Sequence, residues 1–249
     1  MRPADEAREA RYLKFKAKNP QVPFSRYLME RQYRNMRKGD QAPSGALRIA
    51  LGSPDEFWQS GRAKAEKLMA RAELAPSHKA IEYGCGSLRI GAHFIRFLKA
   101  GHFLGLDVID GFYELGKRAL GPELLSAKSP RFHVIDAAGL AMAEAFDADV
   151  VFSNVVCVHV HPDETAEYFR NLARLAHKPG ARLLFNAHIS DVPLRFEFDG
   201  WSWPMAFYKN ALEGFALVRA ELGRPRMQDG VQTAPVDFEF RRPSCDQFA

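Results

Sequence analysis

Residues 81–91 read IEYGCGSLRIG and join an apolar strand end to a glycine-rich turn. Gly84 and Gly86 predict a turn in which the backbone approaches a ligand closely, because glycine has no Cβ atom and adopts positive φ readily. A carboxylate, Glu82, stands two residues before the first glycine. A negative charge at this place is unexpected in a turn that would hold a phosphate, so it separates the kinds of ligand that the turn can bind.

Three kinds of nucleotide-binding turn compete for this stretch. A Walker loop requires Gly-x4-Gly-Lys-Ser/Thr, and no Lys-Ser/Thr pair follows. A dinucleotide fingerprint would need glycine where Arg89 stands, and Glu82 would repel the pyrophosphate. S-adenosylmethionine has no phosphate, and a carboxylate favours its amino group, sulfonium and ribose hydroxyls. The residues favour S-adenosylmethionine, and a dinucleotide stays open as the weaker alternative.

Strand and helix patterns alternate on both sides of this turn. Near-continuous apolar runs in regular βα alternation predict an α/β fold with a doubly wound, mostly parallel, seven-stranded sheet. Two of the seven strands, 214–222 and 236–242, lie close together at the end of the pattern and predict an antiparallel edge strand. The other strands are expected at 79–83, 102–107, 131–136, 148–154 and 182–188, and the helices between them at 87–99, 111–119, 138–145 and 162–177.

Four segments within residues 76–222 resemble, in order, the motifs of class I S-adenosylmethionine-dependent methyltransferases, which have a Rossmann-like fold. They are 82-EYGCG-86, 103-FLGLDV-108, 132-FHVIDAA-138 and 147-DADVVFSNVVCVHVHPDE-164. Asp107 lies 23 positions after Gly84, near the roughly 20 expected for a ribose-binding acid. Leu88 departs from the pattern, since the family often has glycine there.

The resemblance implies a cofactor-binding set on these motifs. Asp107 would hold the ribose hydroxyls and Val108 would flank the adenine. Asp136 would face the adenine amino group, and Arg89 would reach the methionine carboxylate. The remaining members are Glu82, Gly84, Cys85 and Gly86 in the first motif, Ala137 beside Asp136, and Ser153 and Asn154 under the cofactor.

Two histidines are the candidate general bases for an oxygen acceptor. We predict His159, in the loop after the fourth strand, and His188, at the end of the fifth. An amine acceptor would need no base. The run from His159 to Glu164 also contains His161 and Asp163, but Pro162 turns the chain, so we expect no metal.

The N-terminal region carries an uneven charge. Residues 1–40 hold 11 Lys and Arg against 5 Asp and Glu, a net charge of +6, while the whole chain has +5. We predict that residues 1–52 form a basic helical arm and linker, in which Tyr27, Arg31 and Arg34 share one face of a helix over 24–38 and could meet an anionic acceptor. An alternative is a solvated helix face, and peripheral contact with an anionic membrane through residues 1–40 is another.

Residues 53–249 are predicted to form the Rossmann-like domain. It would comprise a leading helix at 53–75, a cofactor-binding core at 76–188, and an acceptor side at 189–249. With the arm's second helix, the leading helix would cover the cofactor cleft. Six aromatic residues crowd into 196–208 and would line an apolar slot for a small-molecule acceptor. The Asn/Asp/Ser-Pro-Pro-aromatic motif of nucleic-acid amine methylation does not follow the fourth strand, which makes a nucleic acid partner unlikely.

Cysteine usage and the N-terminus indicate where the protein works. The chain has 3 cysteines and begins with a charged stretch without an apolar segment, so we predict reduced thiols and a cytoplasmic location. The predicted function is methyl transfer from S-adenosylmethionine to an O or N atom of a small-molecule acceptor, anionic or amphiphilic. The alternatives are a non-catalytic S-adenosylmethionine-binding protein and a lipid-headgroup methyltransferase. The sequence does not indicate an oligomeric state.

Overall fold

The computed structural model describes residues 3–37 and 54–244 of the chain. Three helices precede the sheet: α1 (Pro3–Lys18), α2 (Phe24–Arg37) and α4 (Pro54–Arg71). Helices were predicted in each of these three places. The predicted linker at 40–52 and the third cysteine, Cys245, lie outside the described residues.

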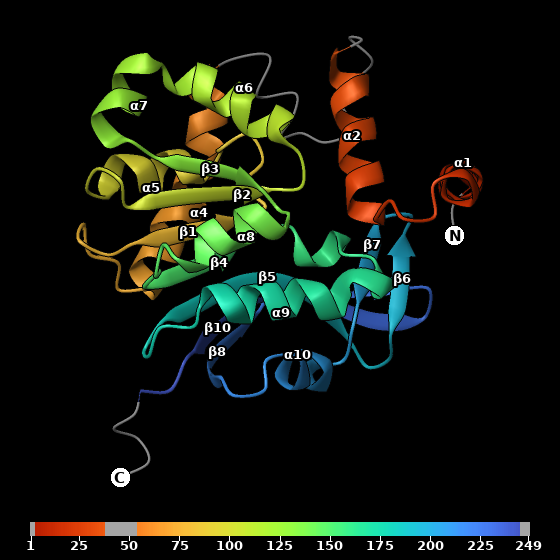
Figure 1. Ribbon diagram of the computed structural model, residues 1–249. Helices are drawn as coiled ribbons and strands as arrows, with labels where there is room; N and C mark the ends of the chain where they lie inside the picture. The colour runs from red at the N-terminus through yellow and green to blue at the C-terminus, as the bar shows by residue number, and fades with distance from the viewer. Residues whose placement is uncertain (1–2, 38–53, 245–249) are drawn as a thin grey trace.

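A mostly parallel sheet forms the centre of the molecule (Figure 1). Its main path runs β3-β2-β1-β4-β5-β10-β8, and β9 pairs with β10 beside this path, which makes eight strands. The strands are β1 (Ala80–Tyr83), β2 (Phe103–Asp107), β3 (Arg131–Val134), β4 (Val150–Ser153), β5 (Arg182–Ser190), β8 (Ala216–Leu222), β9 (Arg226–Gln228) and β10 (Val231–Arg241). The predicted fold class and its seven main strands are confirmed, with β9 as an addition.

The antiparallel strand lies one place inside the edge of the sheet. β10 is inserted between β5 and β8 and runs antiparallel to both, with Phe238 paired to Phe185 on one side and to Ala220 on the other. Its phenylalanines belong to the core, because Phe238 and Phe240 are each 1% exposed and pack on Phe185 of β5. The strand at the edge, β8, is more polar and mostly exposed.

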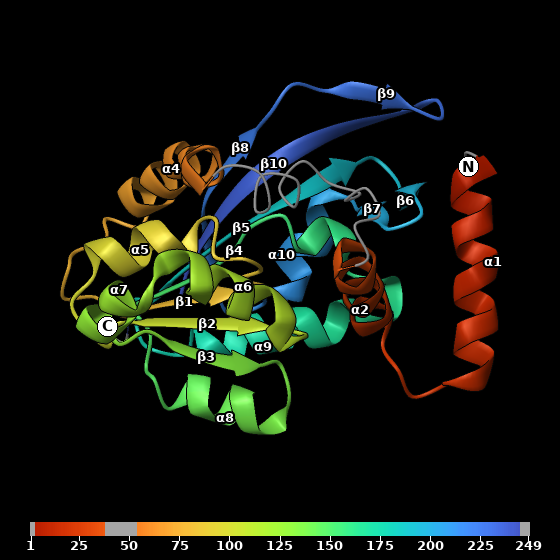
Figure 2. The same ribbon diagram turned by 90° about the horizontal axis from the view of Figure 1, so that it is seen from above.

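Two layers of helices cover the two faces of the sheet (Figure 2). One apolar cluster joins α8 (Ala137–Glu144), α9 (Thr165–Leu175) and α10 (Met205–Ala211) to one face. A second cluster joins α4, α5 (Gly91–Phe97) and α6 (Asp110–Leu120) to the other face, beside α7 (Pro122–Lys128). Because parallel strands are buried on both faces, β1 and β4 read as unbroken apolar runs apart from Glu82 and Ser153.

Several short elements lie outside the predicted pattern. α7 fills the connection between α6 and β3. A two-stranded sheet, β6 (Leu194–Glu197) with β7 (Gly200–Ser202), follows β5. Two 3-10 turns, η1 (Cys157–His159) and η2 (Pro162–Glu164), stand between β4 and α9. Pro162 begins η2, so the predicted 162–177 helix starts as a tighter turn before α9.

The arm lies against the edge of the sheet at which β2 and β3 end. The arrowheads of these strands point to α2, and α1 lies on the far side of α2 (Figure 2). α4 instead packs on α5 and over the β10–β8 edge, where Lys64 and Lys67 pair with Asp237. Thus α2 lies at the carboxyl edge of the strands, while α4 is joined to the other side of the sheet. Within the described ranges, the helices lack the combination of length and apolar character that crossing a bilayer requires.

Candidate functional site

The glycine turn after β1 has the predicted geometry. The amides of Gly84 and Cys85 donate to the carbonyl of Leu106 at 2.8 and 2.9 Å, which ties the turn to β2. Gly84 and Gly86 have φ of +78° and +51°, a backbone conformation that favours glycine. A Cβ on Gly84 would lie 2.4 Å from a methyl of Val156, whereas one on Gly86 would meet no described atom within 4 Å. The turn is therefore tightly packed against Val156 at Gly84, and it has open space next to Gly86.

The residue between the two glycines contributes only its backbone to the turn. The Sγ atom of Cys85 lies 3.0 Å from the place where a Cβ of Gly105 would stand, so the thiol points into the core. Burial raises the pKa of the Cys85 thiol well above its usual range, and the charge of Asp107 adds to this. Cys85 is thus an unreactive core thiol, and any cofactor contact would come from its main chain.

Leu88 has a backbone conformation that favours glycine. Its φ is +64°, in the left-handed region, and its side chain is fully buried. The side chain packs on α6, where a Cβ on Gly116 would lie 2.7 Å from Cγ of Leu88. A glycine on α6 therefore provides the space for the leucine in the turn. Leu88 belongs to the core beneath the turn and presents no side chain to a ligand.

Glu82 is buried at the end of β1. Burial raises the pKa of its carboxyl well above the usual range, and the neighbouring charge of Asp107 raises it further. The charge of Arg89 and a hydrogen bond from the Gly91 amide act in the opposite direction. Among the described residues, Oε2 of Glu82 has no hydrogen-bond partner. A buried carboxylate oxygen without a donor is costly, and the amino group of a ligand would supply one.

Asp107 lies at the end of β2, where a ribose-binding acid was expected. Its Oδ2 accepts from the Gly86 amide at 2.7 Å, which joins the acid to the glycine turn. Burial raises the pKa of Asp107 to about 6, although hydrogen bonds from the amides of Gly86, Ile109 and Val108 act against the shift. Asp107 and Glu82 thus form two close buried carboxyls at neighbouring strand ends.

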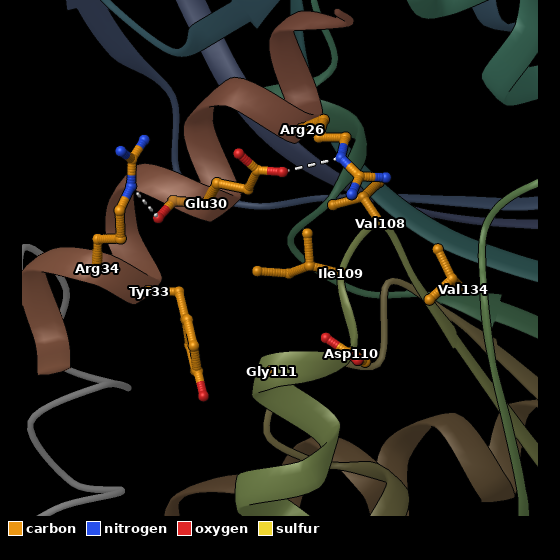
Figure 3. A pocket seen from close by; sticks show the side chains of 9 residues that line it. All are labelled: Arg26, Glu30, Tyr33, Arg34, Val108, Ile109, Asp110, Gly111 and Val134. Atoms are coloured by element: carbon orange, nitrogen blue, oxygen red, sulfur yellow. Dashed lines mark hydrogen bonds and ion pairs between the residues drawn. The ribbon is translucent and has the colours of Figure 1, made fainter.

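A cavity of about 410 Å³ opens beside Val108, between the sheet and α2. In Figure 3, Ile109 and Val134 line the side that follows β2 and β3, and Glu30 and Tyr33 line the side of α2. This volume lies within the range of small-molecule sites. The predicted adenine neighbour, Val108, therefore lines a real cavity, and α2 forms the opposite wall.

Tyr33 fixes α2 over this cavity. Its ring packs where a Cβ of Gly111 would stand, at 2.6 Å, and meets Phe112 edge-on at 5.5 Å between ring centroids. Glycine at the first turn of α6 is what allows α2 to approach so closely. Arg26 and Glu30, on the same helix, form an ion pair at 2.9 Å at the mouth of the cavity.

The third motif ends in a helix cap. Oδ1 of Asp136 accepts from the Gly139 amide at 2.7 Å and begins α8. Asp136 and Ala137 are exposed at the strand ends. The cap holds one carboxylate oxygen of Asp136 and leaves the other for a ligand.

The loop after β4 is strained. Ser153 is fully buried and its hydroxyl accepts from Tyr168 at 2.9 Å, so its side chain belongs to the core. Oδ1 of Asn154 is buried, without a partner among the described residues. Val155 has φ of +56°, held by a 2.6 Å hydrogen bond from its amide to Asn186. A β-branched residue in this conformation costs about 1–3 kcal/mol, a strain found mostly at functional sites.

The two predicted bases lie close enough to each other to interact electrostatically. Nδ1 of His159 donates to the main-chain carbonyl of Asp199 at 2.6 Å, so Nε2 of the neutral ring carries the lone pair. The ring of His188 stacks on Phe196 at 5.1 Å. Burial lowers the pKa of His188, and the charges of His159 and Arg226 lower it further. The structure thus brings together both histidines and a previously unpredicted arginine.

His161 packs among aromatic rings. Its ring lies 5.1 Å from Phe24 and 5.3 Å from Trp201, and its Nδ1 accepts from the Asp163 amide at 3.3 Å. Burial lowers the pKa of His161. Within the part of the chain that the structure describes, no group of three or more His, Cys, Asp or Glu side chains is arranged to hold a metal ion.

The aromatic residues of 196–208 pack in two different clusters. Phe198 and Trp201 join a cluster with Tyr12, Phe24 and Tyr27 of the arm, whereas Trp203, Phe207 and Tyr208 pack on the core of the sheet. Tyr27 is therefore buried against α1 and does not face an acceptor. Phe196 alone stacks on a candidate base.

Four residues of the site were missed by the sequence analysis: Tyr33, Glu164, Asn186 and Arg226. Glu164 accepts from the amides of Phe24 and Ser25, the latter at 3.2 Å, and so caps α2 from a residue 140 positions away. Such contacts have no local signal. Only Asn186, a polar residue in an apolar strand, was recognisable from its sequence context.

Residues 81–185 match the family model described as a methyltransferase domain. No curated protein sequence matches the chain.

Three solved structures illustrate the likeness of the fold. Magnesium protoporphyrin IX methyltransferase from Synechocystis PCC 6803, with bound S-adenosylmethionine, is 16% identical with a TM-score of 0.56, over 89% of this chain and 99% of that one. An S-adenosylmethionine-dependent methyltransferase from Methanosarcina mazei is 14% identical with a TM-score of 0.52, over 71% and 97%. The [4+2]-cyclase SpnF is 13% identical with a TM-score of 0.58, over 73% and 81%. At such identities the likeness is one of fold.

Proposed function

We propose that this chain, whose residues 81–185 match a methyltransferase domain and whose fold is like that of S-adenosylmethionine-dependent methyltransferases, transfers a methyl group from S-adenosylmethionine to an oxygen or nitrogen atom of a small-molecule acceptor. The observation that carries this proposal is the hydrogen bond of His159, whose Nδ1 donates to the carbonyl of Asp199 and whose Nε2 can therefore accept a proton. The amide of His159 donates to the carbonyl of Val156, which packs against Gly84 of the glycine turn. An anionic or amphiphilic acceptor fits best, since Arg226 acts on His188 in the same region.

The strand ends fit the cofactor chemically. Two buried acceptor oxygens without described partners, on Glu82 and Asn154, suit an amino group. The open space above Gly86 suits a ligand that approaches the main chain. Asp107 would hold the ribose hydroxyls, and Val108, Asp136 and Ala137 the adenine. The bound cofactor supplies an electrophilic methyl on a sulfonium.

Arg89 acts on Glu82, in addition to the contact with the methionine carboxylate that the sequence predicts. Its charge lowers the pKa of Glu82, so it acts on the buried acid at the end of β1. We propose that Arg89 favours the ionised form of Glu82 against burial, which raises the pKa of this carboxyl well above its usual range, and so helps it to accept from the amino group. Contact of Arg89 with the methionine carboxylate would be a second use of the same side chain.

Positioning is the main task of the protein, because holding two reactants in line supplies about 7–11 kcal/mol of barrier lowering. His159 would take the proton of a hydroxyl acceptor, and the carbonyl of Asp199 would orient its ring. His188 stays neutral at neutral pH because burial lowers its pKa, so it can accept a hydrogen bond from the acceptor. The wall formed by α2 would exclude water from the cofactor.

We place the enzyme in the cytoplasm. Cys85 and Cys157 are buried and unpaired, and burial raises the pKa of both thiols. Thiols of this kind suit a reducing compartment.

The test uses tritium-labelled S-adenosylmethionine. Wild-type protein is incubated with a metabolite extract filtered below roughly 1 kDa, and label is followed into small molecules by chromatography. We expect a labelled product that S-adenosylhomocysteine suppresses. If the acceptor atom is a hydroxyl oxygen, the His159→Gln variant should form this product far more slowly. Binding of S-adenosylhomocysteine without any labelled product would favour a non-catalytic binding protein, and label confined to lipid would favour the headgroup enzyme.

A further inference from the structure

A second cavity, of about 210 Å³, lies between α1 and α2, away from the cofactor cavity. We propose that it binds an oxyanion, the phosphate or carboxylate group of a small molecule. Arg8 and Arg11 of α1 and Arg31 of α2 line it, together with the amides of Gln32 and Asn35. All five side chains carry N–H donors that an oxyanion could accept from.

The lining is strongly one-sided in charge. Three arginines line the cavity, and none of its lining residues is acidic. Among the residues that the structure describes, Arg11 and Arg31 make no ion pair with a carboxylate, and the recorded partner of Arg31 is the Tyr27 hydroxyl at 3.1 Å. Like charges around a small cavity repel one another, and a bound anion turns this repulsion into attraction.

Two of the three guanidinium groups are held in place. Arg8 pairs with Asp199 at 3.2 Å and with Asp5 at 3.6 Å, and its guanidinium lies 4.4 Å from the centre of the Phe198 ring. Arg31 is bonded to Tyr27, which is itself buried. A guanidinium matches the two oxygens of a carboxylate or phosphate, and an ordered one loses less entropy on binding.

The cavity is joined to the proposed base through one residue. The carboxylate of Asp199 accepts from Arg8, and the carbonyl of the same residue accepts from His159. An oxyanion at Arg8 would therefore lie next to the residue that orients His159. The site itself does not depend on methyl transfer, so it can be tested without an acceptor.

The experiment is a titration with inorganic phosphate followed by ³¹P NMR, on the full chain. The Arg11→Gln/Arg31→Gln variant removes two charges from the cavity. The control, Lys14→Gln/Lys18→Gln, removes two exposed charges from α1 outside it. We expect saturable phosphate binding by the wild type, at least about tenfold weaker binding by the cavity variant, and binding within about twofold of wild type by the control. Absence of saturable binding, or equal loss in the two variants, would overturn the proposal.

Two further arms separate the source of the oxyanion and the state of the protein. Vesicles containing phosphatidylglycerol should bind less well to the cavity variant if the anion is a lipid headgroup, and inorganic phosphate should compete with them. Vesicle binding reduced equally in both variants would indicate diffuse charge on the arm and overturn the cavity site. Calorimetry with S-adenosylhomocysteine on the same samples reports the fold and the proposed function. Phosphate binding without S-adenosylhomocysteine binding would support this site and contradict the proposed function. S-adenosylhomocysteine binding without phosphate binding would contradict only this site.

Discussion

The two sides of the cleft at the carboxyl edge of the sheet are built differently. On the cofactor side, the contacts join neighbours in sequence: Asp107 accepts from Gly86, 21 positions away. On the acceptor side, they join distant segments: Arg8 pairs with Asp199, 191 positions away, and Glu164 caps Phe24, 140 positions away. The first side is mostly main chain and buried acids, while the second is a cluster of rings and ion pairs.

This difference indicates that cofactor binding and methyl transfer can be changed separately. A turn fixed by glycines and strand ends keeps its shape when a distant segment moves. A wall made by α2 depends on its docking to η2 and to the β6–β7 hairpin. We therefore expect changes where the arm docks on η2 and on the hairpin to affect methyl transfer more than cofactor binding. Changes at the strand ends, or at Tyr33 over the cofactor cavity, should affect both.

The largest expected effect is on the acceptor side. In His159→Gln, methyl transfer to a hydroxyl acceptor should fall by about 10²–10⁴-fold, because general-base catalysis contributes this much. The affinity for S-adenosylhomocysteine should stay within about twofold of wild type. His177→Gln, at a more exposed histidine, is the control. Unchanged transfer in His159→Gln would show that η1 holds no base.

Docking of the arm is the next comparison. Phe24 is 1% exposed among the rings of α1 and the hairpin, so Phe24→Ala should weaken the docking of the arm by about 3–5 kcal/mol. Limited proteolysis should then cut within residues 3–37, while Phe97→Ala, at a ring that is 40% exposed, should leave the arm protected. Loss of the whole fold in Phe24→Ala would contradict the separation of the two sides.

On the cofactor side, Asp107→Asn should weaken S-adenosylhomocysteine binding by about 10–100-fold, because hydrogen bonds to a charged group are worth about 1.5–3 kcal/mol. Calorimetry measures this directly. Asp147→Asn removes a 51% exposed charge that does not line the cofactor cavity and should bind almost as wild type. Equal affinity of Asp107→Asn and wild type would make the ribose assignment wrong.

The same substitution should make the unliganded protein more stable. The pKa of Asp107 rises from 3.8 to about 6 on folding, so the folded state holds its proton more tightly. Its contribution to stability is full below the unfolded pKa and is lost as the pH rises through about 6, a loss of at most about 3 kcal/mol. At pH 8, Asp107→Asn should therefore raise the free energy of unfolding in urea titrations. Lower stability of the variant at pH 8 would contradict the raised pKa.

The smallest effect is expected at the cap of α2. Glu164→Gln keeps an acceptor but loses its charge at the helix N-terminus, which should weaken docking of the arm by about 1 kcal/mol. Hydrogen exchange at the Phe24 and Ser25 amides measures it. Asp163→Asn is the matched control, since that side chain is 86% exposed. Equal exchange rates in both variants would show that the charge of Glu164 has no part in docking.

The cofactor side was predictable because its signals are local. The strand-acid-glycine order at 82–86, followed by an acid at 107, predicted the turn, its carboxyl-edge position and the fold class. Leu88 was recognised as a departure, but its partner Gly116 was not, because a buried leucine and a glycine 28 positions later share no pattern.

The acceptor side was predicted less well for a physical reason. The aromatic run at 196–208 has the composition of a core or of a pocket, and composition does not distinguish the two. Whether a given ring packs in the core or against the arm depends on α1 and α2, whose partners lie more than 130 positions away in the sequence. The charge of the arm indicated an anionic partner without indicating that Arg8 is held by Asp199.

The central claim is that the edge formed by Glu82, Gly86 and Asp107 binds S-adenosylmethionine. Calorimetry of the wild-type protein with S-adenosylhomocysteine tests it most directly. We predict saturable binding at one site per chain near pH 8, with affinity that falls as the pH drops below about 6, because Asp107 with a pKa of about 6 then becomes protonated. Absence of binding at pH 8 would contradict the account.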